Sequence, residues 1–132
     1  INEFRHSSAS MHNKAEVLER LVQLNDFCAD DPEDVQLSPH SVAACLQFLL
    51  DNSDLSTPEI AATSGGNVVC QWRKDRNRNL TIEFLSDAIL RYVVFAPFPD
   101  EVIRTSGKCS VRDLRSILAP LQIERWATCN AV

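Results

Sequence analysis

Residues 67–95 alternate between apolar and polar side chains, and this alternation constrains the fold more than any other feature of the chain. In the first two runs the apolar side chains take every second position, in the order Val68, Cys70, Trp72 and then Leu80, Ile82, Phe84. The third run, AILRYVVFAP, is rich in β-branched and aromatic residues and keeps the same period. A period of two is that of a strand and excludes a helix. The sequence therefore predicts an antiparallel β-meander at the centre of a small α+β protein.

The pairing of the last two strands of this meander can also be predicted. If residues 86–88 form the connecting loop, Glu83 lies opposite Arg91, and the apolar pairs on the other face are Ile82–Tyr92 and Phe84–Leu90. This register requires Ala88 to adopt the left-handed conformation that favours glycine. The alternative, shifted by one residue, pairs Phe84 with Arg91. We prefer the first register because it pairs opposite charges.

Two helices are predicted before the meander. Residues 13–28 have apolar side chains at steps of three and four, with Asn13 as the N-cap. The next helix begins at Ser38, has Pro39 at its first position and ends at Asn52–Ser53. Its buried face is expected to comprise Val42, Cys45, Leu46, Leu49 and Leu50. The two helices should form an N-terminal hairpin that packs on a three- to four-stranded sheet.

The region after the meander is predicted to be less regular. A short extended piece at residues 102–104 leads to a turn at Gly107, and Ser110 caps a short helix that ends before Pro120. Residues 121–127 are expected to form a last strand or a packed tail.

A chain of 132 residues has the usual size of one domain. We expect residues 13–132 to form a single α+β domain and residues 1–12 to be a flexible tail. Met11 is the sole methionine, which favours a native start there and a vector-derived remnant before it. An ordinary flexible tail is the alternative.

Composition limits the compartment and the partners. The net charge of −5 disfavours a general nucleic-acid or acidic-membrane binder, and no apolar run approaches the length of a membrane span. The five cysteines are scattered and never form a C-x-x-C pair, which favours free thiols in a reducing cytoplasm.

The chain has no recognisable catalytic pattern, which favours a non-enzymatic protein without cofactor or metal. An enzyme whose site converges only in three dimensions is the alternative. Cys45 and His40 are five residues apart and would not share a helix face. The acidic residues between 30 and 34 lack the spacing of a calcium loop, so a solvated loop is the simpler interpretation.

Two surfaces remain as binding candidates. The third strand of the meander is apolar on both faces, which is typical of a central strand or an interface. It predicts a protein partner or a homodimer, contacted by Ile89, Arg91, Tyr92, Val93 and Phe95. The alternative is a basic hairpin tip that binds nucleic acid through Arg73, Lys74, Arg76 and Arg78. A polar turn that only prevents aggregation would give the same pattern.

The order of these segments resembles a group of small bacterial proteins of uncharacterised function, carried on integron gene cassettes or near toxin–antitoxin genes. The resemblance lies in TPEI, NVVCQWRKDRNRNLTIEFLSD, RYVVFAP, SVRDLRSIL and the final Trp126. It implies a cytoplasmic accessory protein of the mobile bacterial genome with an antitoxin-like or adaptor role, and it supplies no active site. This chain departs from the group at Ala88, where glycine is usual, and lacks the tryptophan–aspartate–glycine segment after the first helix.

Overall fold

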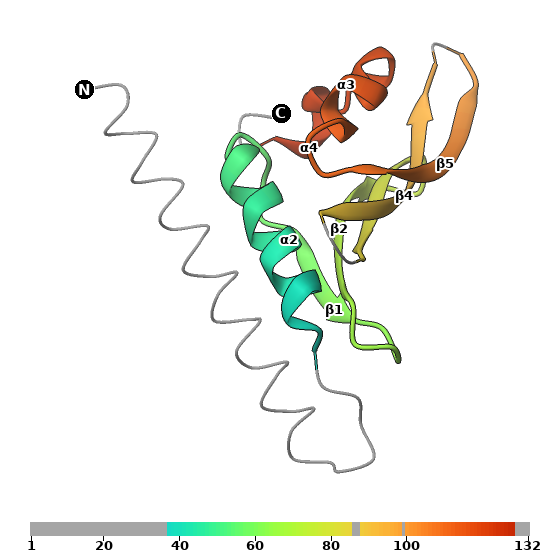
Figure 1. The fold of residues 1–132 in the computed structure, drawn as a ribbon. Helices are drawn as coiled ribbons and strands as arrows, with labels where there is room; N and C mark the ends of the chain where they lie inside the picture. The colour runs from blue at the N-terminus through green and yellow to red at the C-terminus, as the bar shows by residue number, and fades with distance from the viewer. Residues whose placement is uncertain (1–36, 86–87, 99, 129–132) are drawn as a thin grey trace.

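The computed structural model describes residues 37–85, 88–98 and 100–128. Its elements form two layers: an antiparallel sheet and, packed on one face of it, helix α2 with a helical C-terminal segment (Figure 1). In chain order the elements are α2 (Pro39–Asp51), β1 (Glu59–Ala62), β2 (Val68–Asp75), β3 (Arg78–Phe84), β4 (Ile89–Pro97), β5 (Val102–Ser110), α3 (Leu114–Leu118), the short 3-10 helix η1 (Ala119–Leu121) and α4 (Glu124–Ala127). The α+β class is confirmed.

Helix α2 begins and ends where the sequence predicts. The Ser38 hydroxyl accepts a hydrogen bond from the backbone N–H of Ser41, and Pro39 occupies the first helical position. At the other end, the side-chain amide and the backbone N–H of Asn52 both donate to the carbonyl of Phe48. Both ends of the helix are therefore capped by its own sequence.

The buried face of α2 differs from the predicted one. Its buried residues are Ser41, Ala44, Cys45 and Phe48. The predicted Val42, Leu46 and Leu49 are only partly buried, and Leu50 is 44 % exposed. Both sets have helical spacing, so periodicity alone cannot separate them. The small side chains of Ser41 and Ala44 let the helix approach the sheet closely, which selects their face.

The sheet is a five-stranded meander in the order β1-β2-β3-β4-β5, with every neighbouring pair antiparallel, so the predicted number of three to four strands is wrong. Strands β1 and β2 lie on either side of Gly65–Gly66. The predicted register of β3 and β4 is confirmed, because Glu83 pairs with Arg91, Ile82 with Tyr92 and Phe84 with Leu90. Ala88 has the positive φ of 62° that this register requires.

Strand β5 corrects the prediction of a short extended piece and a turn at Gly107. It runs for nine residues, from Val102 to Ser110, and pairs with β4 along its whole length. Gly107 lies opposite Tyr92, and a Cβ added there would lie 3.0 Å from the tyrosine Oη. The glycine therefore makes room for an aromatic ring rather than a turn.

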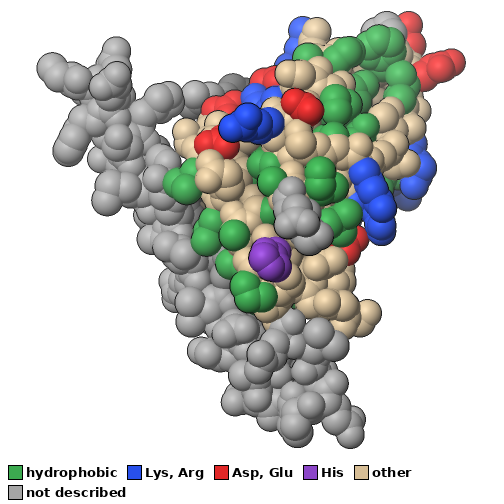
Figure 2. Space-filling model, viewed as in Figure 1, with side chains coloured by type: hydrophobic (Ala, Val, Ile, Leu, Met, Phe, Trp, Pro, Cys, Tyr) green, Lys and Arg blue, Asp and Glu red, His purple; other side chains and the backbone are tan. Residues whose placement is uncertain are grey.

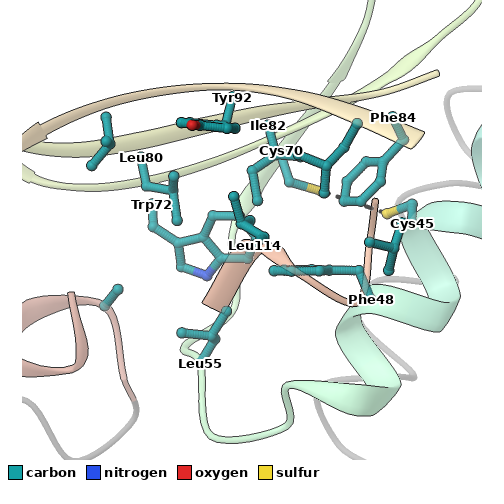
Figure 3. Packing of buried hydrophobic residues seen from close by; sticks show 14 of the residues in the cluster. Cys45, Phe48, Leu55, Cys70, Trp72, Leu80, Ile82, Phe84, Tyr92 and Leu114 are labelled. Atoms are coloured by element: carbon teal, nitrogen blue, oxygen red, sulfur yellow. Dashed lines mark hydrogen bonds between the residues drawn. The ribbon is translucent and has the colours of Figure 1, made fainter. Parts of the chain in front are cut away.

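The core lies between the sheet and the helices (Figure 3). Every second residue of the central strands is buried, as the alternation predicts, and the Phe48 ring of α2 packs against Trp72 and Phe84 at centroid distances of 6.0 and 5.7 Å. Leu114, Leu118 and Ile123 contribute the C-terminal side of the same cluster. The Trp72 indole N–H donates to the carbonyl of Ser56 at 2.7 Å.

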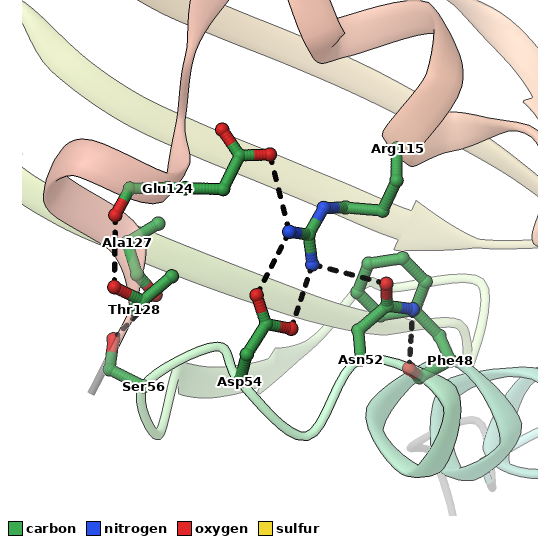
Figure 4. Close-up of polar contacts among 8 residues, drawn as sticks. All are labelled: Phe48, Asn52, Asp54, Ser56, Arg115, Glu124, Ala127 and Thr128. Carbon is green, nitrogen blue, oxygen red and sulfur yellow. Dashed lines mark hydrogen bonds and ion pairs between the residues drawn. The ribbon is translucent and has the colours of Figure 1, made fainter. Parts of the chain in front are cut away.

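The C-terminal segment is helical, so the predictions of a last strand and of a Ser110 cap are wrong. Helix α3 starts three residues later than the cap would require, with Asp113 at the N-cap position. The guanidinium of Arg115 holds the segment against the loop after α2 (Figure 4). It donates two hydrogen bonds to Asp54, at 2.9 Å each, and others to Glu124 and Asn52. An antiparallel bridge between Leu55 and Thr128 completes this contact.

Some predictions lie outside the described residues. The tail at 1–12 and the first helix at 13–28 belong to the undescribed residues 1–36. In the described part of the chain, α2 precedes the sheet and the other helices follow it. The N-terminal helical hairpin thus stays a prediction.

Candidate functional site

Four of the five predicted partner-binding residues lie on one surface. Ile89, Arg91, Val93 and Phe95 alternate along β4 on the face of the sheet opposite the core, and no described helix covers this face. We call it the open face. The fifth residue, Tyr92, is on the core side and only 7 % exposed, so its prediction as a contact residue is wrong. Alternation along the strand places Tyr92 on the same face as Leu90 and Val94. Its ring fits against Gly107, where there is no Cβ.

The open face combines apolar and basic side chains along β4 and β5. Ile89 is 37 % exposed and Val102 is 47 % exposed. Arg91 forms an ion pair with Glu83 at 3.6 Å on one side, and pairs with Lys108 on the other. Arg104 lies opposite Phe95. Like charges directly opposite one another destabilise a strand pair, so Arg91 and Lys108 carry a cost that a negatively charged partner would relieve.

Strand β5 is an edge of the sheet. Within the described residues it pairs with β4 alone, which leaves the backbone groups of its outer side without a strand partner. A long edge strand can accept another strand by main-chain hydrogen bonding. The exposed Arg104 and Lys108 are the kind of charged side chains that limit indiscriminate pairing there.

The four cations of the predicted nucleic-acid site do not form one patch. Arg76 occupies the two-residue turn between β2 and β3, and an irregularity in the pairing at Lys74 interrupts the alternation. Asp75 organises the turn, because its carboxylate accepts from the backbone N–H of Asn77 and from Arg78. The first of these bonds, then the Arg78 contacts, lowers the pKa of Asp75.

The side chains of the hairpin face three ways. Arg73 alternates with Gln71 toward the open face, and Arg76 is at the tip, whereas Lys74 and Arg78 line a groove on the other side. Figure 2 likewise shows basic side chains at separate places on the visible surface, some of them beside acidic ones. Two cations of the hairpin, Lys74 and Arg78, thus line the groove on the protein surface. The four cations do not lie together on a surface that could contact DNA.

The groove has a volume of about 730 Å³. It lies between the hairpin, the end of β4 with Phe98, and the C-terminal segment from Pro120 to Trp126. A smaller hollow of about 400 Å³ lies on the open face over β1, β2 and β3, beside Val69 and Thr81. No pattern in the sequence predicts the groove, because three segments far apart in the chain form it.

The thiols of Cys45 and Cys70 are part of the hydrophobic core. The Sγ atoms of Cys45 and Cys70 are 3.5 Å apart, and both side chains are fully buried. The hydrogen bond with Cys45 and then burial raise the pKa of Cys70 well above its usual value, which suppresses the nucleophilic thiolate. His40 is exposed at the start of α2.

Within residues 37–85, 88–98 and 100–128, no three or more His, Cys, Asp or Glu side chains lie close enough together to hold a metal ion. No helix in those ranges has the length and apolar character needed to cross a membrane.

Comparisons of the chain with protein-family models, with curated proteins and with solved structures found no match.

Proposed function

We propose that the protein is a non-enzymatic interaction module that binds a protein partner on the open face, beside the edge of β5. The observation that carries this proposal is the set of exposed apolar side chains, Ile89 and Val102, among Arg91, Arg104 and Lys108 on a face without a described cover. Apolar contacts supply affinity, while basic side chains select a partner with acidic groups.

A second copy of the chain is one partner of this kind. Residues 26–34 contain five acidic side chains, which complement the cations of the open face. Two open faces meeting directly would instead bring like charges together, so the charge pattern favours contact between the open face and an acidic segment. Such an association should weaken as salt rises.

Light scattering coupled to size exclusion tests the self-association form. We expect a dimer or larger particle at micromolar concentration, and a monomer for the double variant Ile89→Glu, Val102→Glu. The matched control is Ile117→Glu, which changes a residue of α3 that is 42 % exposed. A monomer at all concentrations up to about 200 μM at low salt would reject self-association, since an association with a dissociation constant in the micromolar range would form a dimer there.

The partner need not be a second copy. A pull-down from a bacterial lysate tests for another protein, with the wild type, Ile117→Glu and the double variant as baits. A bacterial protein retained by the wild type and by Ile117→Glu, but lost from the double variant, would support the open face as the binding surface. Equal retention by all three baits would contradict it.

We further propose a bacterial cytoplasmic protein of the mobile genome with an antitoxin-like or adaptor role. The sequence resemblance supports this, and the free thiols of Cys45, Cys70 and Cys109 are in keeping with a reducing compartment. Flanking genes provide the test: a toxin-like neighbour whose toxicity this protein suppresses would support an antitoxin role, and unchanged toxicity on co-expression would exclude it.

Nucleic-acid binding through the hairpin is the second candidate. Gel shifts at low salt test it, because counterion release favours binding most under that condition. No shift at low salt would exclude it.

A further inference from the structure

The groove between the β2–β3 hairpin and the C-terminal segment has the character of a ligand site. Its volume of about 730 Å³ lies within the range of roughly 300–1,000 Å³ that is usual for small-molecule pockets. Its cations Lys74 and Arg78 lie on the side of the sheet opposite the cations of the open face, although Pro97, the strand partner of Val102, also lines it. An inference about it therefore does not rest on the proposed protein partner.

The groove is positively charged. Lys74, Arg78 and Arg125 line it from β2, β3 and α4, and none of its lining residues in the described part of the chain is acidic. Arg78 forms an ion pair with Asp75 at 2.7 Å. Lys74 and Arg125 have no carboxylate partner among the described residues. Three cations from three elements surround an anion better than a single charged strand would, and arginine and lysine are the usual phosphate ligands.

The same groove has an aromatic wall. Phe98 is 48 % exposed at the end of β4, although a phenylalanine ring normally seeks burial. Trp126 also lines the groove, and its indole N–H is buried without an acceptor within the described residues. A buried donor without a partner is rare and calls for an explanation. Exposed aromatic rings beside cations are the surfaces on which bases stack while their phosphates are held.

We propose that this groove binds a nucleotide, with the phosphate held by Lys74 and Arg125 and the base stacked against Phe98. The nucleotide is either free or the terminal residue of a nucleic-acid strand. An acidic peptide would satisfy the cations but would leave the aromatic wall without a flat ring to stack on.

Isothermal titration of the full chain with AMP, adenosine and inorganic phosphate tests the proposal at low salt. We expect AMP to bind measurably and more tightly than adenosine or phosphate alone. Lys74→Gln and Arg125→Gln should each weaken AMP binding about tenfold, the usual effect of one charged hydrogen bond. Phe98→Ala should also weaken it about tenfold, while reducing the difference between AMP and phosphate.

The matched control is Arg76→Gln, which removes a cation from the same hairpin but outside the groove. Its AMP affinity should equal that of the wild type. Arg112→Gln, at an exposed position before α3, controls for net charge. Circular dichroism confirms that each variant is folded, which is expected because every changed side chain is at the surface.

A 5′-phosphorylated deoxyadenosine hexamer distinguishes the two sources. If it binds much more tightly than AMP and depends equally on Arg125, the ligand is the end of a strand; if it binds no better, the ligand is a free nucleotide. No binding of either would overturn the proposal. So would an equal loss with Arg76→Gln, which would indicate unspecific attraction, or a tetraglutamate peptide that binds as tightly as AMP.

Discussion

Ser41 is the buried polar residue through which α2 is joined to the sheet. Its hydroxyl donates to the carbonyl of Phe84 at 2.6 Å and accepts from the backbone N–H of Val68 at 2.7 Å. These two groups lie at the ends of β3 and β2, so one hydroxyl satisfies two strands. Because Ser41 is fully buried, bulk water cannot reach these two backbone groups and replace the hydroxyl as their hydrogen-bond partner.

Replacing Ser41 with alanine should therefore lower the free energy of unfolding by about 2 kcal/mol, since two buried groups lose their partner. Urea denaturation followed by tryptophan fluorescence measures the change. Ser116→Ala, at an exposed position of α3, is the control and should change the free energy by less than about 0.5 kcal/mol. Equal midpoints for the two variants would show that the hydroxyl contributes nothing.

Cys70 makes stability depend on pH in the alkaline range. Its pKa is raised above the ordinary 9.0 by the bond with Cys45 and by burial. Above pH 9 the unfolded thiol loses its proton while the folded thiol keeps it, so the folded state binds more protons and stability falls as pH rises. Below pH 9 both states are protonated and this contribution is complete.

We thus expect the free energy of unfolding to decrease between pH 8 and pH 10, and to decrease less steeply in Cys70→Ala. The slope is compared, because the alanine variant also leaves a cavity that lowers stability at every pH. Cys109→Ala provides a second comparison, since burial raises the pKa of that thiol as well. A slope unaffected by Cys70→Ala would contradict the assignment.

At the scale of elements, the close packing of β4 on β5 depends on the absence of a side chain at Gly107. A Cβ there would lie 3.0 Å from Oη and 3.3 Å from Cζ of Tyr92. Gly107→Ala should lower stability by about 1–2 kcal/mol, the usual cost of overpacking. Thermal unfolding measures this loss.

Gly65→Ala is the matched control for that change. The nearest atom to an added Cβ there is Thr63 Oγ1 at 3.7 Å, an ordinary contact. Combining Gly107→Ala with Tyr92→Phe removes the closest atom and should restore part of the loss. No restoration would place the strain elsewhere than at the hydroxyl.

The pairing of two strands could be predicted from the sequence where the apolar pattern and a charge pair favour the same alignment. The register of β3 and β4 followed because apolar pairing and the Glu83–Arg91 pair select the same alignment. Strand β5 was missed as a full strand because VIRTSGKCS has polar residues on both faces and a glycine that is typical of a turn. Helix α4 is only four residues long, too short for a periodic pattern to appear.

The candidate site was predictable only where one element carries it. Alternation along β4 assigns Ile89, Val93 and Phe95 to one face, and the structure places them there. Tyr92 was included because the strand is apolar on both faces, although alternation places Tyr92 with Leu90 and Val94 on the side that is the core. The groove could not be predicted, because Lys74, Phe98 and Arg125 are brought together by tertiary packing alone.

At the scale of the whole molecule, charge is divided unequally along the chain. Residues 1–36 contain three Lys or Arg and eight Asp or Glu, whereas residues 37–132 contain ten of each. The net charge of −5 thus belongs to the first 36 residues. The net charge therefore does not exclude anionic ligands for the described part of the chain, where local clusters of charge determine what binds.

Arg115 connects three parts of the molecule: α3, the loop after α2, and α4. Its removal should weaken the packing of all three. It joins α3 to Asp54 after α2 and to Glu124 of α4. Arg115→Met should lower stability by about 1 kcal/mol, because the pair with Asp54 is bidentate but both ion pairs are partly exposed. Calorimetry at low and high salt measures it, with Arg112→Met as the exposed control. A loss that grew with salt would contradict an electrostatic origin.

The contact between residues 55–56 and the C-terminal helices also orders the events of folding. Each hairpin of the meander joins strands that are adjacent in the chain, whereas Ser56 and Ala127 are 71 residues apart. Closing that loop rather than one of four residues costs about 2.5 kcal/mol more in chain entropy. The hydrogen bond from the Ser56 N–H to Ala127 should thus form after the strands pair and open before they separate. In hydrogen exchange, the Ser56 amide should lose its protection well before the Val68 amide, and α3 and α4 should be the last elements to dock.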